Sequence, residues 1–149
     1  MAHRTNRRRF LQTSAVTGVG FWVSGSSRAA DSDAPNERIR FACVGVGGKG
    51  STDTEACGRR GAEVGICDLD EQRPDTDAKK FPNAKKFVDY RKMLEELGDN
   101  VDAVTVSTPD HTHAVASLAA MRMGKHCFTQ KPMTHLIQEA RLMGQVAGE

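Results

Sequence analysis

The sequence has no uninterrupted apolar run of about eighteen residues, the shortest length that an ordinary membrane-spanning helix requires. Acidic residues are absent from the first thirty positions, where five of the 21 basic residues occur. The remaining sequence therefore holds 16 basic and 19 acidic residues, so it lacks the basic excess typical of nucleic-acid-binding domains. No internal repeat is visible, and a length of 149 residues suits one domain.

The four cysteines also lack the spacing of a zinc site or a C-x-x-C redox pair. Cys43, Cys67 and Cys127 fall in expected strands, which predicts buried, inert thiols. His111 and His113 are separated by one residue, but no Cys or carboxylate cluster accompanies them at ligand spacing. We therefore expect no metal site.

The N-terminal arginines form part of an expected twin-arginine signal peptide over residues 1–29. The stretch 6–12 reads Asn-Arg-Arg-Arg-Phe-Leu-Gln, a mildly apolar region follows, and Ser27-Arg28-Ala29 places small residues at a cleavage position. Two alternatives remain open, a disordered basic arm that binds nucleic acid and an uncleaved membrane anchor. With export, the protein would be periplasmic or secreted. Residues 30–37 are expected to be a linker and 38–149 the folded body.

A glycine cluster follows the first apolar, β-prone run, Ile39 to Val44. Gly45, Gly47 and Gly50 fit the pattern G-x-G-x-x-G. Gly45 would allow a tight turn, Gly47 a close approach of a diphosphate to the backbone, and Gly50 close packing of the next helix. The N-terminus of that helix would attract the phosphates.

Asp68 ends the second apolar run, about twenty residues after the glycine cluster. Its carboxylate would accept hydrogen bonds from the adenosine ribose hydroxyls. Because a carboxylate would repel a 2′-phosphate, NAD is expected as the cofactor and NADP is less favoured. The combination of strand, glycine cluster, strand and acid is far more specific than the glycine pattern alone.

Apolar runs and helical patterns alternate along the body. Tyr90, Met93, Leu94 and Leu97 form one apolar helical face, and Gly98 follows as a C-cap. The strands are expected at 39–44, 64–67, 85–88, 101–107 and 126–129. Three helices are expected at 51–60, 73–80 and 90–97. A fourth is expected to follow a cap at Asp110, with one row formed by Val115, Leu118, Ala119 and Arg122. A fifth is expected to follow a cap at Thr134, with one face formed by Leu136, Ala140, Met143 and Ala147. This alternation predicts an α/β fold with a doubly wound parallel sheet, a Rossmann-type NAD(P)-binding domain.

Two later stretches make a family resemblance specific. They are Ser107-Thr-Pro-Asp-His-Thr-His-Ala114 and Gly124-Lys-His-Cys-Phe-Thr-Gln-Lys-Pro132. Together with the glycine cluster, they resemble the Gfo/Idh/MocA oxidoreductases over residues 38–149. The family usually has Asn at the place of Asp110 and Glu at the place of Gln130.

The resemblance implies roles for individual residues. Lys131 would be catalytic, beside the nicotinamide and the reacting carbon, where its ammonium could stabilise a developing alkoxide. The peptide bond before Pro132 would often be cis. The residues expected to contact the cofactor are Gly45, Gly47, Gly48, Gly50, Asp68, Thr108, Pro109, His113, Gln130 and Lys131.

The resemblance also implies a second, α+β domain that carries substrate contacts and usually the general base, and we expect this domain to be missing from residues 1–149. One hypothesis is therefore the nucleotide-binding half of a sugar or polyol oxidoreductase. The other is a non-catalytic dinucleotide-binding fragment of a truncated or split gene. The expected partner is a small-molecule sugar or polyol, without nucleic acid or stable membrane insertion, and the family's homo-oligomer is doubtful without the second domain.

Replacing Arg7 and Arg8 together by lysine is expected to retain the protein in the cytoplasm, because the twin-arginine pathway reads the arginine pair. Fractionation of a bacterial host would measure this. Arg4→Lys, outside the pair, is the matched control. Continued export of the double variant would contradict the assignment of the leader.

Overall fold

The computed structural model describes residues 38–70 and 79–149. The expected signal peptide and linker lie outside the described residues. Most of the helix expected at 73–80 also lies outside the described residues, and residues 79 and 80 form a turn. Among the residues described, no helix is both long and apolar enough to cross a membrane.

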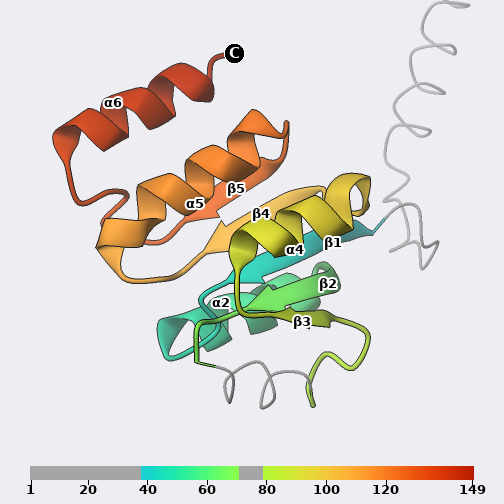
Figure 1. Ribbon diagram of the computed structural model, residues 1–149. Coiled ribbons are helices and arrows are strands. Elements are labelled where there is room, and N and C mark those ends of the chain that lie inside the picture. Colours follow the sequence, from blue (N-terminus) through green and yellow to red (C-terminus); the bar gives the residue numbers. More distant parts are fainter. Residues whose placement is uncertain (1–37, 71–78) are drawn as a thin grey trace, which may run out of the picture. The chain divides into compact units, whose positions relative to one another are not determined.

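Five parallel strands form one sheet in the order β3-β2-β1-β4-β5 (Figure 1). The strands are β1 (Ile39–Val44), β2 (Gly61–Cys67), β3 (Lys85–Phe87), β4 (Ala103–Val106) and β5 (His126–Thr129). The order reverses at β1, because β2 lies on one side of β1 and β4 on the other. The expected doubly wound parallel sheet is thus confirmed.

Helices cover both faces of the sheet. They are α2 (Lys49–Gly58), α4 (Tyr90–Leu97), α5 (Asp110–Arg122) and α6 (Ile137–Val146), with a 3₁₀ turn, η1 (Gly98–Asn100), after α4. Figure 1 shows α4 and α5 on one face and α2 on the other, with α6 beyond α5. This arrangement follows from right-handed crossovers between parallel strands.

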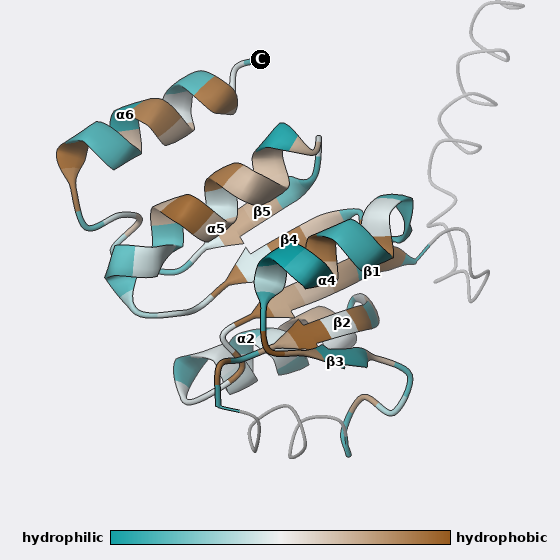
Figure 2. Ribbon diagram, in the orientation of Figure 1, coloured by the Kyte–Doolittle hydropathy of each residue, from teal (hydrophilic) through white to brown (hydrophobic). Residues whose placement is uncertain are grey.

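The core has two parts, one on each side of the sheet, because successive strand residues point to opposite faces. On one side, Ala42 and Val44 of β1 pack with residues of β4, α4 and α5. On the other side, Cys43 packs with Ile66 of β2. Figure 2 shows hydrophobic residues along these central strands, whereas α4 carries hydrophilic residues as well.

The apolar row expected for 90–97 is confirmed, since Met93, Leu94 and Leu97 are buried and Asp89 caps α4 by accepting from the Arg91 amide. Gly98 follows the helix with a positive φ, as a C-cap glycine should.

The first helix begins two residues earlier than the expected 51–60 and also ends earlier, at Gly58. Its buried residues are small, Gly50 and Thr54, and the Thr54 hydroxyl donates to the Gly50 carbonyl over 2.8 Å. A helix that packs with glycine and threonine lies close to the sheet, so it lacks the large apolar row by which helices are recognised.

The row expected for α5 is right only at Leu118 and Ala119, which pack in the core, and wrong at Val115 and Arg122, which are exposed. Val115 is 47% exposed, whereas Ala116 and Ala120 pack toward the sheet and Ala114 and Leu118 pack with Met143 of α6. Small residues dominate because α5 is enclosed on two sides. In α6 the expected face is buried only at Met143, while Leu136 and Ala147 are exposed.

The four cysteines are free thiols. Cys43 and Cys67 are buried and Cys57 and Cys127 are half-buried. Burial raises the pKa of Cys67 to about 12, and hydrogen bonding with Cys57 together with burial raises the pKa of Cys43. Two of the three strand cysteines thus occupy the inert, buried positions expected, and Cys127 is only partly covered.

Glu63 on β2 is an unexpected buried carboxyl. The residue is 8% exposed, and its Oε1 atom has no hydrogen-bond partner in the described part of the chain. It lies against α2, so close that a Cβ on Gly58 would be 2.2 Å from Oε1. Burial raises the pKa of this carboxyl above its ordinary value.

Glu63→Gln should remove a pH-dependent loss of stability. Between the ordinary pKa, 4.5, and the raised one, the folded state holds a proton that the unfolded state has released. The free energy of unfolding therefore falls as the pH rises through this window. At neutral pH, Glu63→Gln should gain about 1 kcal/mol over the wild type, measured by urea unfolding.

The control for this comparison is Glu95→Gln, on the exposed side of α4. Parallel pH profiles for wild type and Glu63→Gln would show that the buried carboxyl has an ordinary pKa.

Candidate functional site

The carboxyl ends of four parallel strands meet at one edge of the sheet. Three main-chain hydrogen bonds extend the ladders past the strand ends: Gly45 N–H to Cys67 O (2.8 Å), Ser107 N–H to Val44 O (2.8 Å) and Gln130 N–H to Val106 O (2.9 Å). The loops after β1, β2, β4 and β5 are therefore held in register. Ligands of open α/β sheets bind at this edge, where the strand order reverses.

The glycine loop is shaped by two close approaches. Gly45 has a φ of +78°, and a Cβ there would lie 2.8 Å from the main chain of Ser107 and Thr108. A Cβ on Gly50 would lie 1.9 Å from the Gly45 carbonyl oxygen. Gly45 thus makes the tight turn, and Gly50 lets α2 begin directly against it. Gly48 also has a positive φ, +56°.

Asp68 lies beside the glycine loop. Its Oδ2 atom accepts from the amides of Val46 (3.1 Å) and Gly47 (3.3 Å), and its Oδ1 accepts from the amide of Asp70 (3.1 Å). The Gly47 amide, which we expected to face a diphosphate, therefore faces this carboxylate. Since a carboxylate has about four acceptor positions, Asp68 can hold the loop and still accept from a hydroxyl group.

The loop after β4 differs from the expectation in one respect. Asp110 is the first residue of α5 rather than its cap, because Pro109 occupies the N-cap position. The Asp110 carboxylate accepts instead from the amide of His111 (2.8 Å) and lies 3.4 Å from the Nδ1 atom of His135. Hydrogen bonding with His135 lowers the pKa of Asp110.

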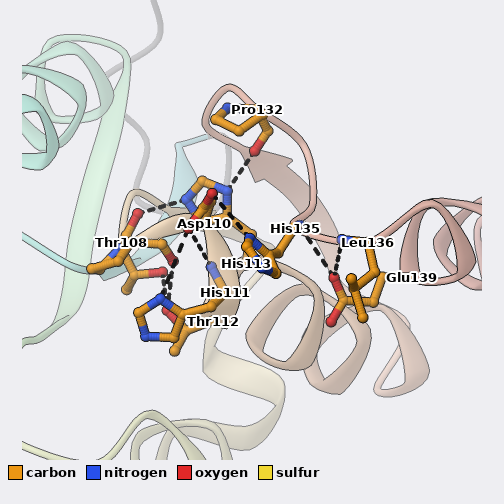
Figure 3. A network of polar contacts seen from close by, with 10 residues as sticks. Thr108, Asp110, His111, Thr112, His113, Pro132, His135, Leu136 and Glu139 are labelled. Carbon is orange, nitrogen blue, oxygen red and sulfur yellow. Dashed lines mark hydrogen bonds and ion pairs between the residues drawn. The ribbon is translucent and has the colours of Figure 1, made fainter.

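His113 joins the loops after β4 and β5 (Figure 3). The residue is 1% exposed, its Nε2 lies 2.6 Å from the Thr108 carbonyl oxygen, and its Nδ1 lies 2.7 Å from the Pro132 carbonyl oxygen. Each ring nitrogen thus has a carbonyl oxygen within hydrogen-bond distance, and the tautomer of the ring decides which nitrogen donates. Both nitrogens are occupied, so His113 holds the two loops together.

The chain after Pro132 reaches α6 through further polar contacts (Figure 3). Thr134 does not cap α6 as expected, since Leu136 occupies the N-cap position and the Thr134 hydroxyl donates to the Leu136 carbonyl. The Glu139 carboxylate accepts from the amides of His135 (3.2 Å) and Leu136 (2.9 Å). Glu139, in the first turn of α6, thus satisfies the amides of the N-cap residue and of the residue before it.

Asp53 and Ser107 join the site, although the sequence patterns did not indicate them. The Asp53 Oδ2 atom accepts from Ser107 Oγ and from Gln130 Nε2, both at 2.9 Å. Its Oδ1 accepts from the ammonium of Lys49. Burial opposes ionisation, but the hydrogen bonds with Lys49, Gln130 and Ser107 prevail and lower the pKa of Asp53.

Lys131 follows Gln130 at the end of β5 and is exposed. Its amide donates to the Gln130 Oε1 atom over 2.8 Å. The Lys131–Pro132 bond is cis, as the resemblance implied. Within the described residues, no group of three His, Cys, Asp or Glu side chains is arranged to hold a metal ion.

An open cavity of about 420 Å³ lies between β5, α5 and α6. Its lining includes the sulfur-containing side chains of Met121, Cys127, Met133 and Met143, and also Gln130 and Lys131. No residue of the glycine loop contributes to it. The cavity therefore adjoins the functional edge only through Gln130 and Lys131.

Comparison with protein families matches residues 39–149 to the Gfo/Idh/MocA family, described as an oxidoreductase family with an NAD-binding Rossmann fold. The chain belongs to this family. The match covers the sheet, the glycine loop and both stretches that carried the resemblance. The Gfo/Idh/MocA domain thus accounts for the order of the elements and for the cluster of loops at the edge of the sheet.

Three similar proteins illustrate the relationship. A glycosyl hydrolase family 109 protein of Akkermansia muciniphila is 36% identical over 128 residues, which is 78% of this chain and 27% of that protein. The WlbA dehydrogenase of Bordetella pertussis, solved with NADH and UDP-GlcNAcA, is 25% identical with a TM-score of 0.68, covering 75% of this chain and 35% of its own.

The third is the UDP-N-acetylglucosamine 3-dehydrogenase GnnA of Acidithiobacillus ferrooxidans, at 28% identity and a TM-score of 0.66, covering 74% of this chain and 35% of its own. The chain thus spans about a third of the length of these relatives. The shared part is the nucleotide-binding domain.

His113→Ala should lower the free energy of unfolding by about 2–4 kcal/mol, because it removes a buried ring and leaves two carbonyl groups without their partner. Thermal and urea unfolding would measure the loss. His111→Ala, on the exposed side of the same helical turn, is the control and should cost less than about 0.5 kcal/mol. Equal effects of the two substitutions would contradict the bracing role of His113.

Proposed function

We propose that this chain is the NAD-binding half of a sugar or polyol dehydrogenase that transfers a hydride to or from nicotinamide. The observation that carries the proposal is the position of the Asp68 carboxylate, 3.1 Å and 3.3 Å from two amides of the glycine loop. A carboxylate in this position supports the proposal, because it would accept from ribose hydroxyls next to the turn at which a diphosphate would bind.

The residues present suit a dinucleotide. The glycine loop leads into the N-terminus of α2, whose partial positive charge favours phosphate, and Gly47 and Gly48 leave the backbone uncovered by side chains. Thr108 and Pro109 lie at the neighbouring strand end and would flank the nicotinamide side. NAD is favoured over NADP, because the Asp68 carboxylate would repel a 2′-phosphate.

Lys131 is the proposed catalytic residue. A nicotinamide bound at this edge would supply the hydride acceptor or donor. The exposed Lys131 ammonium would then donate a hydrogen bond to the substrate oxygen and stabilise negative charge that develops on it. Gln130 lies between Lys131 and the glycine-loop helix and would contact the cofactor from its half-buried position.

A relative's name favours a second candidate. The Akkermansia muciniphila protein is described as a glycosyl hydrolase, and nicotinamide-dependent glycoside cleavage is a known departure from the usual two-carboxylate mechanism. With a full-length enzyme of this type, aglycone release without net NADH formation would favour glycoside cleavage. NADH formation from a free sugar would favour the dehydrogenase. A protein that binds NAD without either reaction would be the non-catalytic fragment.

Export through the twin-arginine pathway is also proposed, on the sequence of residues 1–29 alone. By general understanding that pathway moves folded proteins, so a cofactor bound before export would accompany the protein.

The preference for NAD can be tested by calorimetry on the full chain. NAD should bind at least about tenfold more tightly than NADP, and Asp68→Ala should remove most of that difference, because the carboxylate no longer accepts from the ribose or repels a phosphate. Asp70→Ala is the control, since it removes a neighbouring carboxylate and keeps the main-chain amide that donates to Asp68. Tighter binding of NADP to the wild type, or an unchanged preference in Asp68→Ala, would refute the role of Asp68.

A further inference from the structure

A chain of hydrogen bonds leads from α2 to the main chain of Lys131. Asp53 on α2 accepts from the Gln130 side-chain amide over 2.9 Å, and the Gln130 side-chain carbonyl accepts from the Lys131 amide over 2.8 Å. The three residues come from segments 77 positions apart in sequence. The helix after the glycine loop is thereby connected to the residue at the end of β5.

The two partners of Gln130 determine its orientation. A carboxylate only accepts hydrogen bonds and a main-chain amide only donates them, so the Gln130 nitrogen must face Asp53 and its oxygen must face Lys131. Glutamate at this position could accept from Lys131, but its second oxygen would meet the Asp53 carboxylate. A carboxamide satisfies both partners, whereas a carboxylate does not.

Asp53 itself is held from three sides. Ser107 at the end of β4, Lys49 at the start of α2 and Gln130 all donate to its carboxylate, and its side chain is only 13% exposed. A carboxylate with this many donors is confined to one position, because any rotation would break several hydrogen bonds at once. The Asp53 carboxylate can therefore hold the Gln130 side-chain amide in one position.

We propose that Asp53 is a positioning residue for Lys131, acting through Gln130. Asp53 orients the Gln130 amide, and Gln130 in turn fixes the main chain from which the Lys131 side chain extends. Part of this inference rests on the proposed function, since the role of Lys131 at a nicotinamide belongs to it. The connection between Asp53 and the Lys131 amide does not depend on that role.

Hydrogen exchange at the Lys131 amide, followed by NMR on the full chain, tests the connection. Asp53→Ala should lower the protection of this amide about tenfold, because Gln130 loses its anchor. Gln130→Glu should lower it as well, since two carboxylates would then face each other. Glu55→Ala, which removes a carboxylate from the same helix at a surface ion pair with Lys80, is the control and should leave the protection unchanged.

The exchanged pair Asp53→Asn with Gln130→Glu provides the decisive variant. The introduced asparagine can donate to the introduced glutamate and to Ser107, and its carbonyl oxygen can accept from Lys49. The introduced glutamate accepts from the Lys131 amide, so every partner is satisfied again. Protection should return to within about twofold of the wild type. A general loss of stability would not be repaired by restoring this one pairing.

Two results would overturn the proposal. One is unchanged protection of the Lys131 amide in folded Asp53→Ala, and the other is a double variant no better protected than Gln130→Glu. Titration of the same samples with NAD distinguishes failure of the proposed function from failure of the connection between Asp53 and Lys131. If the wild type shows no NAD-induced shifts, the proposed function fails, while the exchange data still decide whether Asp53 orders Lys131.

Discussion

The close approach of the glycine loop to the end of β4 is the constraint on which the functional edge depends. Gly45 turns with its α-carbon against the Ser107–Thr108 peptide, and Gly50 begins α2 against the Gly45 carbonyl. Neither contact leaves room for a Cβ. The parallel pairing of β1 shifts register against β2 between Phe41 and Ala42 and is regular from there to the strand ends, so this packing also sets the distance between the loops after β1, β2 and β4. Asp68 then closes the loop from the side of β2.

Two polar braces extend this order to β5, the last strand of the sheet in the described part of the chain. His113 holds the loops after β4 and β5 through two carbonyl oxygens, and the Asp53 carboxylate holds Gln130 from the side of α2. The braces act from opposite faces of the sheet. Lys131 follows Gln130 and precedes Pro132, so residues held by the two braces flank it, while its own side chain is exposed.

The elements with large apolar residues could be predicted from sequence, as the confirmed face of α4 illustrates. The elements that pack through small residues could not. Helix α2 buries glycine and threonine, and α5 buries alanine and serine on two sides, so the pattern of large residues pointed to the wrong row at Val115. The expectation that Asp110 caps α5 was also wrong, because the helix begins at Asp110 itself and Pro109 occupies the N-cap position.

The sequence by itself determined the parallel α/β fold, the glycine turn, the acid after the second strand and the family. Each of these depends on residue type and spacing within a short segment, so it can be predicted from the local sequence pattern. Only the tertiary structure decided which polar side chains meet. Asp53 finds Gln130 across 77 positions, Glu63 is buried beneath α2, and both nitrogens of His113 are taken by carbonyl groups. Such pairings depend on how separate elements pack, so they cannot be predicted from the spacing of residues along the chain.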